Sequence, residues 1–528
     1  MLNYAYPKAG TENAIISVHI AYKDESGFDV KSMFSVPTDS DLGNSVVFVD
    51  LKWFNDEDFV VTWGNRVQNK TCAYWYKSSE PLFSQKIPEL NEFSSTGWVA
   101  KVDLLLIEDA DFNLHAFQIQ SINGYQNVFQ VQITPTVVKT QLTNFHYIES
   151  GKRAVLNFKG FHVPSNRVWF TGTAWEAYDR HIFSAPATFG KEYTGVPDEN
   201  PWCITCDDWV NNGEIDGNPG HFTIPNKNTG GNRTLCRYAD VSLPDEKYIG
   251  HVEIMTATCY GPGIPYSVAS SLCDCGRRII FDPYFVVLED NYKLEDNLET
   301  KSLPQRSLDN KFYSERTGLN FSYEAFFPPN FDENKEYAVL VDIYAGPGSQ
   351  AIRSRFSLDF SDHLMTSKNN VILVRLDARG SGNDNDELKH SVYRKIGQIE
   401  RVDVTDFVDW FSEQEFVDKS KLAIWGWSFG GYATSHVAAY NEGSQLFNCA
   451  VAVAPLTSRT YYDTLWSEIT MGLPDDNTEG YTKGEVWGGD DSDMRNFDDI
   501  KFSVIHGTAD DNVHFQNAAR LSKEMGSR

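Results

Sequence analysis

The chain has 528 residues, of which 41% are apolar and 14% aromatic, enough for about three ordinary domains or two large ones. Its 46 basic and 73 acidic residues give a net charge of 46 − 73 = −27, so general nucleic-acid binding through Lys and Arg is not expected. No apolar run approaches the ~20 residues that a membrane span needs. The N-terminus also lacks the basic start and the apolar stretch of a signal peptide.

The first half of the chain predicts antiparallel β-structure. Short runs at 46–49 and 59–63 have the composition of strands. Within 114–133, Asn123-Gly124 joins two alternating runs and supplies the positive φ angles of a type I′ hairpin turn. Strands repeated over about 290 residues, with few helical stretches, favour a β-propeller or a sandwich. The charged segment that follows, 288–297, predicts a linker.

The cysteines point to an oxidising compartment. Six of the eight fall within 73 residues. The Cys203-x-x-Cys206 pair, with Cys236 and Cys259 downstream, fits either a zinc site or two disulfides. Because the surroundings are a polar loop, 195–235, we favour disulfides. The candidate N-glycosylation sites are Asn69, Asn232 and Asn320.

The second half of the chain predicts an α/β fold. Its short apolar runs are 338–344, 371–376, 422–425, 450–454 and 502–506. The i, i+3, i+4, i+7 spacing of one apolar helix face is present at Val404, Phe407, Val408 and Phe411. Continuously apolar strands separated by helices indicate a parallel sheet that is covered on both sides.

The strongest chemical signal is Gly426-Trp-Ser428-Phe-Gly430, a match to G-x-S-x-G. A short apolar strand precedes it and a helical segment follows it, which is the context that the motif requires. Such a turn forces the serine outward, and glycines on either side let the backbone turn and the helix pack closely. The helix N-terminus and the N–H of Phe429 then face the developing oxyanion. We therefore interpret Ser428 as a nucleophile.

A serine nucleophile needs a base, and in α/β-hydrolases the order is Ser, then Asp or Glu, then His. The best acid lies past the last apolar strand, at Asp510 or Asp511. The histidines nearby do not fit the base: His514 is too close to the acid in sequence, and His436 lies two turns along the helix after the serine.

A second strand end carries Tyr344-Ala-Gly-Pro-Gly348. A turn there could bring a backbone N–H or the Tyr344 hydroxyl to the oxyanion.

Together these motifs resemble the prolyl oligopeptidase family, and more narrowly its dipeptidyl peptidase IV branch. The segments that carry the resemblance are 341–347, 424–432 and 506–515, with 4–10, 95–99, 259–263 and 471–474 fitting the same template. The resemblance implies a β-propeller, partial in this chain, over 1–287, a linker over 288–310, and an α/β-hydrolase catalytic domain, truncated at its C-terminus, over 311–528.

The resemblance also implies a serine-type dipeptidyl peptidase that releases N-terminal dipeptides with proline or alanine second. Ser428 would be the nucleophile and Asp510 the triad acid, with the oxyanion hole formed by the Tyr344 hydroxyl and the Phe429 N–H. The implied proline pocket consists of Leu456, Tyr462, Trp466 and Val513, with Asn512 binding the substrate carbonyl. By position, Cys203–Cys206 and Cys236–Cys259 look like family disulfides. We expect no cofactor and no metal.

Three positions depart from the family pattern. Trp466 stands where the family pocket has a tyrosine, and this bulkier wall predicts a narrower choice of substrate. Phe429 replaces the usual tyrosine, which its backbone role tolerates. An aromatic position near the pocket is Arg459 here.

Other family features fall outside the sequence. The paired glutamates that hold the substrate α-ammonium, and the membrane anchor, would precede Met1. The catalytic histidine would follow Asp510 by about thirty residues, beyond Arg528. We therefore expect a fragment that is not by itself an efficient peptidase. The full-length parent would be a homodimer acting on peptides, either a type II protein facing outward from the cell membrane or secreted.

Two alternatives remain open. One is a non-catalytic ectodomain relative that binds another membrane protein, although Ser428 is kept in full context. The other is a different α/β-hydrolase, an oligopeptidase or acylaminoacyl peptidase, against which the extended match around Asp510 argues.

Overall fold

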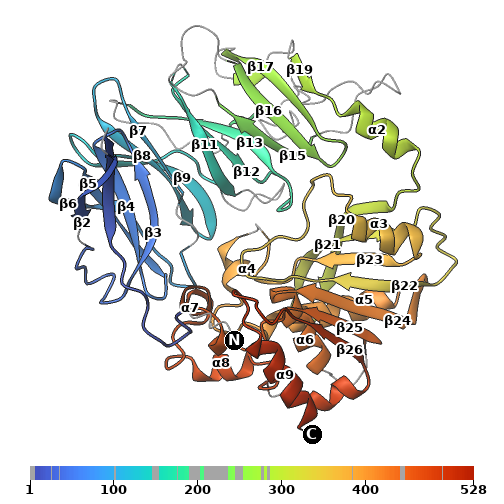
Figure 1. The fold of residues 1–528 in the computed structure, drawn as a ribbon. Coiled ribbons are helices and arrows are strands. Elements are labelled where there is room, and N and C mark those ends of the chain that lie inside the picture. The colour runs from blue at the N-terminus through green and yellow to red at the C-terminus, as the bar shows by residue number, and fades with distance from the viewer. Residues whose placement is uncertain are drawn as a thin grey trace.

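A computed structural model gives the fold (Figure 1). It describes residues 6–24, 27–34, 36–99, 103–145, 154–163, 165–174, 176–189, 202–206, 236–243, 254–274, 279–281, 286–382, 385–440, 446–489 and 492–527. Asn232 and most of the predicted loop 195–235 lie outside these residues.

The N-terminal part is a series of antiparallel sheets set in an arc, as expected for part of a β-propeller (Figure 1). The first sheet pairs β1 (Val18–Asp24) with β2 (Gly27–Phe34). The next contains β3 (Val46–Trp53), β4 (Asp58–Asn65), β5 (Lys70–Lys77) and β6 (Glu80–Phe93). The third contains β7 (Leu104–Glu108), β8 (Leu114–Ile122), β9 (Tyr125–Gln132) and β10 (Val138–Gln141).

Two further sheets complete the arc. One contains β11 (Val155–His162), β12 (Arg167–Gly172), β13 (His181–Pro186) and β14 (Trp202–Cys203). The other contains β15 (Tyr238–Ser242), β16 (Ile254–Gly261), β17 (Tyr266–Asp274), β18 (Ile279–Phe281) and β19 (Val286–Glu289). Strands that are consecutive in the chain pair within each sheet, except that β19 pairs with β17 rather than with β18.

The hairpin predicted at Asn123-Gly124 is confirmed. It joins β8 to β9, and both turn residues have positive φ, 52° and 84°. These are the backbone angles that a type I′ turn requires and that Asn and Gly tolerate best.

The cysteines pair as disulfides, Cys203 with Cys206 and Cys236 with Cys259. Both pairs are buried, the first at the strand end of β14 and the second beside β15 and on β16. The structure therefore agrees with the disulfide interpretation rather than with the zinc alternative.

The C-terminal part is built on a seven-stranded sheet in the order β20-β21-β23-β22-β24-β25-β26. Its strands are β20 (Gln305–Ser314), β21 (Leu319–Phe327), β22 (Tyr337–Asp342), β23 (Ile372–Leu376), β24 (Val417–Trp427), β25 (Cys449–Val453) and β26 (Lys501–Ile505). The five strands from β23 to β26 pair in parallel, as predicted. β21 pairs antiparallel with both β20 and β23, which the sequence analysis did not anticipate.

Helices alternate with many of these strands along the chain and lie around the sheet (Figure 1). They are α2 (Tyr292–Glu299), α3 (Phe360–His363), α4 (Asp386–His390), α5 (Ile399–Ser412), α6 (Phe429–Ala439), α7 (Thr464–Met471), α8 (Thr478–Lys483) and α9 (Gln516–Gly526), with short η2 (Leu364–Lys368), η3 (Arg459–Tyr461) and η4 (Met494–Asp498). The predicted apolar face of α5 is buried. Among the described residues, no helix combines the length and hydropathy needed to cross a bilayer.

The domain boundaries stay predictions, but two elements fall in the range predicted as a linker. α2 occupies residues 292–299, and β20 begins at Gln305 and joins the seven-stranded sheet. β20 is a polar strand at the sheet edge, so its sequence lacks the apolar run that marked the inner strands.

The propeller and the α/β part meet along a seam of specific contacts. The Nδ1 of His390 on α4 shares a 2.9 Å hydrogen bond with the Thr96 hydroxyl, and its ring lies 4.6 Å from that of Trp98. Elsewhere on the seam the Arg66 Nε lies 2.7 Å from the Glu468 carboxylate on α7. These contacts fix the propeller against the helices that carry the candidate site.

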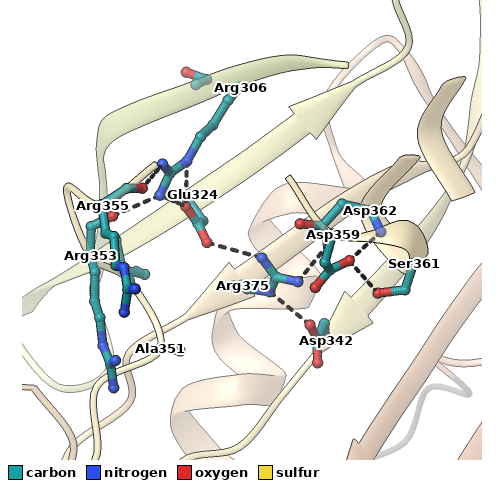
Figure 2. A network of polar contacts seen from close by, with 12 residues as sticks. Arg306, Glu324, Asp342, Ala351, Arg353, Arg355, Asp359, Ser361, Asp362 and Arg375 are labelled. Carbon is teal, nitrogen blue, oxygen red and sulfur yellow. Dashed lines mark hydrogen bonds and ion pairs between the residues drawn. The ribbon is translucent and has the colours of Figure 1, made fainter. Parts of the chain in front are cut away.

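A buried polar network joins the strands that lead to the site (Figure 2). Arg375 on β23 donates to Asp342 at 2.7 Å, to Asp362 at 2.6 Å and to Glu324 at 3.3 Å. Glu324 also accepts from Arg306, whose other nitrogens donate to two carbonyls of the 353–355 loop. That loop contacts the propeller, because Phe356 N donates to Tyr260 O at 2.7 Å. The network therefore links β20–β23 to the seam.

Arg375→Met is expected to destabilise the α/β part. Asp362 is fully buried and would lose the cation that offsets its charge. Removing one partner of a buried ion pair costs about 3–5 kcal/mol. For a domain of this size that lowers Tm by roughly 6–20 °C in differential scanning calorimetry.

The matched control is Arg495→Met, since that arginine is 80% exposed and pairs with exposed Asp493. It should change stability by less than about 1 kcal/mol. Equal Tm values for the two variants would show that the network does not hold the strands together.

Candidate active site

Ser428 lies at the junction between β24 and α6, in a backbone conformation that serine rarely adopts. Its φ and ψ are 58° and −115°, and it occupies the N-cap position of α6. Such angles are costly for a residue with a Cβ and persist only where the surroundings impose them. Here Ser428 N donates to Val453 O at 2.9 Å, and Ser428 O accepts from Tyr432 N at 3.0 Å. The half-buried side chain is therefore held at the C-terminal edge of the parallel strands.

The glycines around Ser428 are required by close backbone contacts. A Cβ on Gly426 would lie 2.5 Å from Ile343 O, and one on Gly430 would lie 2.2 Å from the same oxygen. A Cβ on Gly431 would lie 2.7 Å from Val453 O. The motif glycines thus let α6 start directly against the ends of β22 and β25.

Two groups are available to stabilise an oxyanion beside Ser428. Phe429 is the first residue of α6, where backbone N–H groups have no acceptor within the helix. Tyr344 follows β22 and is 41% exposed, and its ring lies 6.2 Å from that of Phe429. Gly346 lets the ring fold back, since a Cβ there would lie 2.6 Å from it. The ring of one proposed oxyanion donor, Tyr344, thus lies near that of the residue that supplies the other.

Asp510 is held by the loop after β26. Its Oδ1 accepts from Asn512 N at 3.1 Å and from Val513 N at 2.9 Å. Its Oδ2 lies 3.5 Å from the Nε2 of His506, which itself donates to Val513 O at 2.7 Å. Asp510 is thus fixed through Oδ1 by two backbone N–H groups, while Oδ2 lies beside the His506 ring. Asp511 is exposed instead.

Among the described residues of the α/β part, no histidine forms a hydrogen bond with Ser428. His506 is bonded to Val513 O, and the His514 ring lies 4.3 Å from that of Tyr6. His436 is fully buried, its Nε2 lies 3.1 Å from Gly484 O, and burial lowers its pKa to about 3. We predicted that His436 is a packed or a surface residue rather than the base, and its burial agrees with the packed alternative.

The residues predicted to form the proline pocket differ in exposure and in their contacts. The Trp466 ring is 6.4 Å from that of Phe429 and 37% exposed. Leu456 and Val513 are buried. The Tyr462 hydroxyl donates to Asn512 Oδ1 at 2.8 Å, which fixes the side chain predicted to bind a substrate carbonyl.

The sequence analysis missed the role of the N-terminal segment in shaping this site. The Tyr6 hydroxyl donates to Asn512 O at 2.9 Å, and burial raises its pKa. Thr464 N donates to Pro7 O at 2.8 Å, and Gly10 N donates to Glu468 at 2.8 Å. Only the 4–10 motif of the family resemblance marked this segment, because no local pattern reveals a contact more than 450 residues away.

Behind α6 lies the buried carboxyl of Glu400. It is 1% exposed, and its Oε2 accepts from Gly397 N at 2.8 Å while its Oε1 has no hydrogen-bond partner. Burial raises the pKa of Glu400 to about 7. Gly397 approaches α6 closely, since a Cβ there would lie 2.2 Å from the Tyr432 hydroxyl. Glu400 is therefore part of the packing that supports the helix after Ser428.

The predicted glycosylation sites differ in setting. Asn320 is exposed on β21, whereas Asn69 is half-buried in the turn between β4 and β5 and accepts from Asn65 Nδ2 at 2.8 Å. Asn232 lies outside the described residues.

Comparisons with known proteins cover most of the chain. The model of the prolyl oligopeptidase family matches residues 356–528, and that of the dipeptidyl peptidase IV (DPP IV) N-terminal region matches residues 1–214. The human protein named prolyl endopeptidase FAP is 30% identical over 545 residues, covering 99% of this chain and 62% of its own. Dipeptidyl peptidase 4 of Sus scrofa is 30% identical over 532 residues, which cover 98% of this chain and 61% of that protein. Venom dipeptidyl peptidase 4 of Vespula vulgaris is 28% identical over 551 residues, covering 98% and 60%.

Solved structures share the fold. Porphyromonas gingivalis dipeptidyl peptidase 4 matches with a TM-score of 0.73 at 20% identity, covering 99% of this chain and 63% of its own. A putative dipeptidyl aminopeptidase IV from Bacteroides ovatus matches with a TM-score of 0.70 at 18% identity, covering 99% and 66%. The chain spans about three fifths of the length of the curated relatives it matches.

The β-propeller sheets, the α/β-hydrolase sheet and the serine at its strand-to-helix turn define a propeller-bearing α/β-hydrolase. With matches over both parts, the chain belongs to the prolyl oligopeptidase family and is DPP IV-like.

Glu400→Gln should stabilise the protein increasingly as pH rises. The pKa of Glu400 is about 7 in the folded protein, against the usual carboxyl pKa of 4.5 in the unfolded chain. Between these two pH values the folded state keeps a proton that the unfolded state releases. The contribution of the neutral carboxyl to stability is therefore complete below pH 4.5 and is lost as pH rises to about 7. Glutamine mimics the neutral form and keeps an acceptor for Gly397 N. The Tm of the variant should therefore exceed that of the wild type by a margin that widens from pH 5 to pH 8 in thermal unfolding.

Glu479→Gln on α8 is the control, because its carboxylate is 79% exposed. A constant Tm difference for Glu400→Gln across this pH range would contradict a proton held at Glu400.

Proposed function

We propose that the protein is a serine peptidase of the dipeptidyl peptidase type, which releases N-terminal dipeptides with proline or alanine second. The observation that carries this proposal is the strained conformation of Ser428 at the end of β24, beside the Phe429 N–H and Tyr344. The family membership supports it, as do the similar proteins, which are a prolyl endopeptidase and a dipeptidyl peptidase.

The chemistry follows from these positions. Ser428 Oγ would attack the carbonyl carbon of the second substrate residue, and a histidine oriented by the Asp510 carboxylate would take the hydroxyl proton. The Phe429 N–H and the Tyr344 hydroxyl would stabilise the tetrahedral oxyanion. The carbonyl carbon–nitrogen bond then breaks, the amine leaves with the proton, and water hydrolyses the acyl-serine to free the dipeptide.

The pocket around Phe429 supports recognition of the second residue. Trp466, Tyr462 and Val513 provide apolar walls of a size that suits a flat pyrrolidine ring or a methyl group. The Asn512 side chain, fixed by Tyr462, would donate its amide N–H to a substrate carbonyl.

We further propose that the protein faces an oxidising compartment, at the cell membrane or after secretion, and forms a homodimer. The disulfides Cys203–Cys206 and Cys236–Cys259 and the exposed sequon at Asn320 support the compartment. The homodimer rests on the family resemblance alone.

Ser428→Ala tests the catalytic role directly. In protein expressed from its complete transcript, hydrolysis of a Gly-Pro p-nitroanilide should fall by about 10⁴–10⁶ in kcat, because the nucleophile is lost. Covalent labelling by a fluorophosphonate should also disappear.

Ser435→Ala on the same helix is the control, since Ser435 Oγ donates only to Gly431 O, at 2.8 Å. Activity or labelling that persists in Ser428→Ala would refute the assignment of the nucleophile. A wild-type protein that neither hydrolyses nor labels would favour the binding role.

A further inference from the structure

Arg459 presents an unusual buried charge. The residue is 0% exposed, and none of its three guanidinium nitrogens has a hydrogen-bond partner. No carboxylate of the described residues lies within ion-pair distance of it. The charge of Arg459 lowers the pKa of Glu400, but the two side chains form no ion pair. A guanidinium stays protonated in proteins, so a full positive charge with five N–H donors is held without an acceptor.

Aromatic rings surround this cation. Its Cζ lies 5.1 Å from the ring centroid of Phe429, 5.1 Å from that of Trp466 and 5.9 Å from that of Tyr432. Cation–π contacts hold a guanidinium in place, but they leave its N–H groups unsatisfied. Buried polar groups in native proteins nearly always have partners, and an unpaired buried charge is among the costliest. The exception indicates that a partner arrives from outside the chain.

The location of Arg459 identifies the place where that partner would bind. Phe429 directly follows Ser428, and Trp466, which is partly exposed, lies 6.4 Å from Phe429. The guanidinium contacts both rings, so it lies one side chain below the surface of the pocket beside the serine. A guanidinium pairs best with a carboxylate, which it can bind through two parallel hydrogen bonds.

We propose that Arg459 extends the specificity of this pocket to an acidic side chain, aspartate or glutamate, at the residue whose carbonyl Ser428 attacks. The inference rests on the proposed function, since it assumes that the pocket receives that residue. It predicts that substrate choice is wider than proline and alanine, because charge rather than shape selects the acidic residues.

The test compares two ligands that differ only in charge, L-alanyl-L-aspartyl amide and L-alanyl-L-asparaginyl amide. Isothermal titration calorimetry gives their Kd values for the wild-type chain, for Arg459→Met and for Arg459→Lys. We expect the aspartyl ligand to bind the wild type about tenfold more tightly, a difference of about 1.4 kcal/mol. Arg459→Met should reduce the ratio to about one, and Arg459→Lys should retain most of it.

Fluorophosphonate labelling of Ser428 in the same samples distinguishes a failure of the proposed function from a failure of the role proposed for Arg459. Absent labelling of the wild type contradicts the proposed function. Normal labelling with equal affinity for both ligands, or with no binding of either at low millimolar concentration, overturns the role of Arg459 alone. A ratio unchanged by Arg459→Met also overturns it. The wild-type ratio is informative even if a variant fails to fold.

Discussion

The backbone conformation of Ser428 is the constraint on which the rest of the site depends. A serine at φ 58° and ψ −115° is stable only if its neighbours leave it no alternative. The neighbours are glycines whose missing side chains let α6 pack against Ile343 O and Val453 O. This strained backbone conformation places the Ser428 hydroxyl at the sheet edge, next to the first free N–H of the helix. The proposed nucleophile and one proposed oxyanion donor thus arise from one local arrangement.

The remaining parts of the site come from distant segments and depend on the packing between them. Tyr344 follows β22, and Asp510 follows β26. The predicted pocket residues come from the loop between β25 and α7, from α7 itself and from the loop after β26. The parallel sheet brings these strand ends to one edge. The network around Arg375 ties β22 and β23 to the loop that touches the propeller, and the propeller's own N-terminal segment contacts Asn512 and α7 (Figure 2). The segment that precedes the first propeller strand therefore borders the site.

Local sequence patterns predicted the features of the structure that depend only on residues near each other in the chain. The G-x-S-x-G motif with its flanking strand and helix predicted Ser428, and Asn123-Gly124 predicted a hairpin, because turns with positive φ need particular residues nearby. Position in the chain narrowed the candidate acid to Asp510 or Asp511, and the family resemblance selected Asp510. The structure adds that two backbone N–H groups hold Asp510 Oδ1. β20 was missed because a polar edge strand has no apolar signal. Neither the unpaired burial of Arg459 nor the contact of Tyr6 with Asn512 could be predicted, since both depend on which segments meet in space.

The most direct test of this account is a crystal structure of the protein after reaction with a small alkyl fluorophosphonate. The adduct should be on Ser428 Oγ, with its phosphonyl oxygen within about 2.7–3.1 Å of both Phe429 N and the Tyr344 hydroxyl. An adduct on another residue, or a phosphonyl oxygen directed away from both donors, would contradict the assignment of this turn as the catalytic centre.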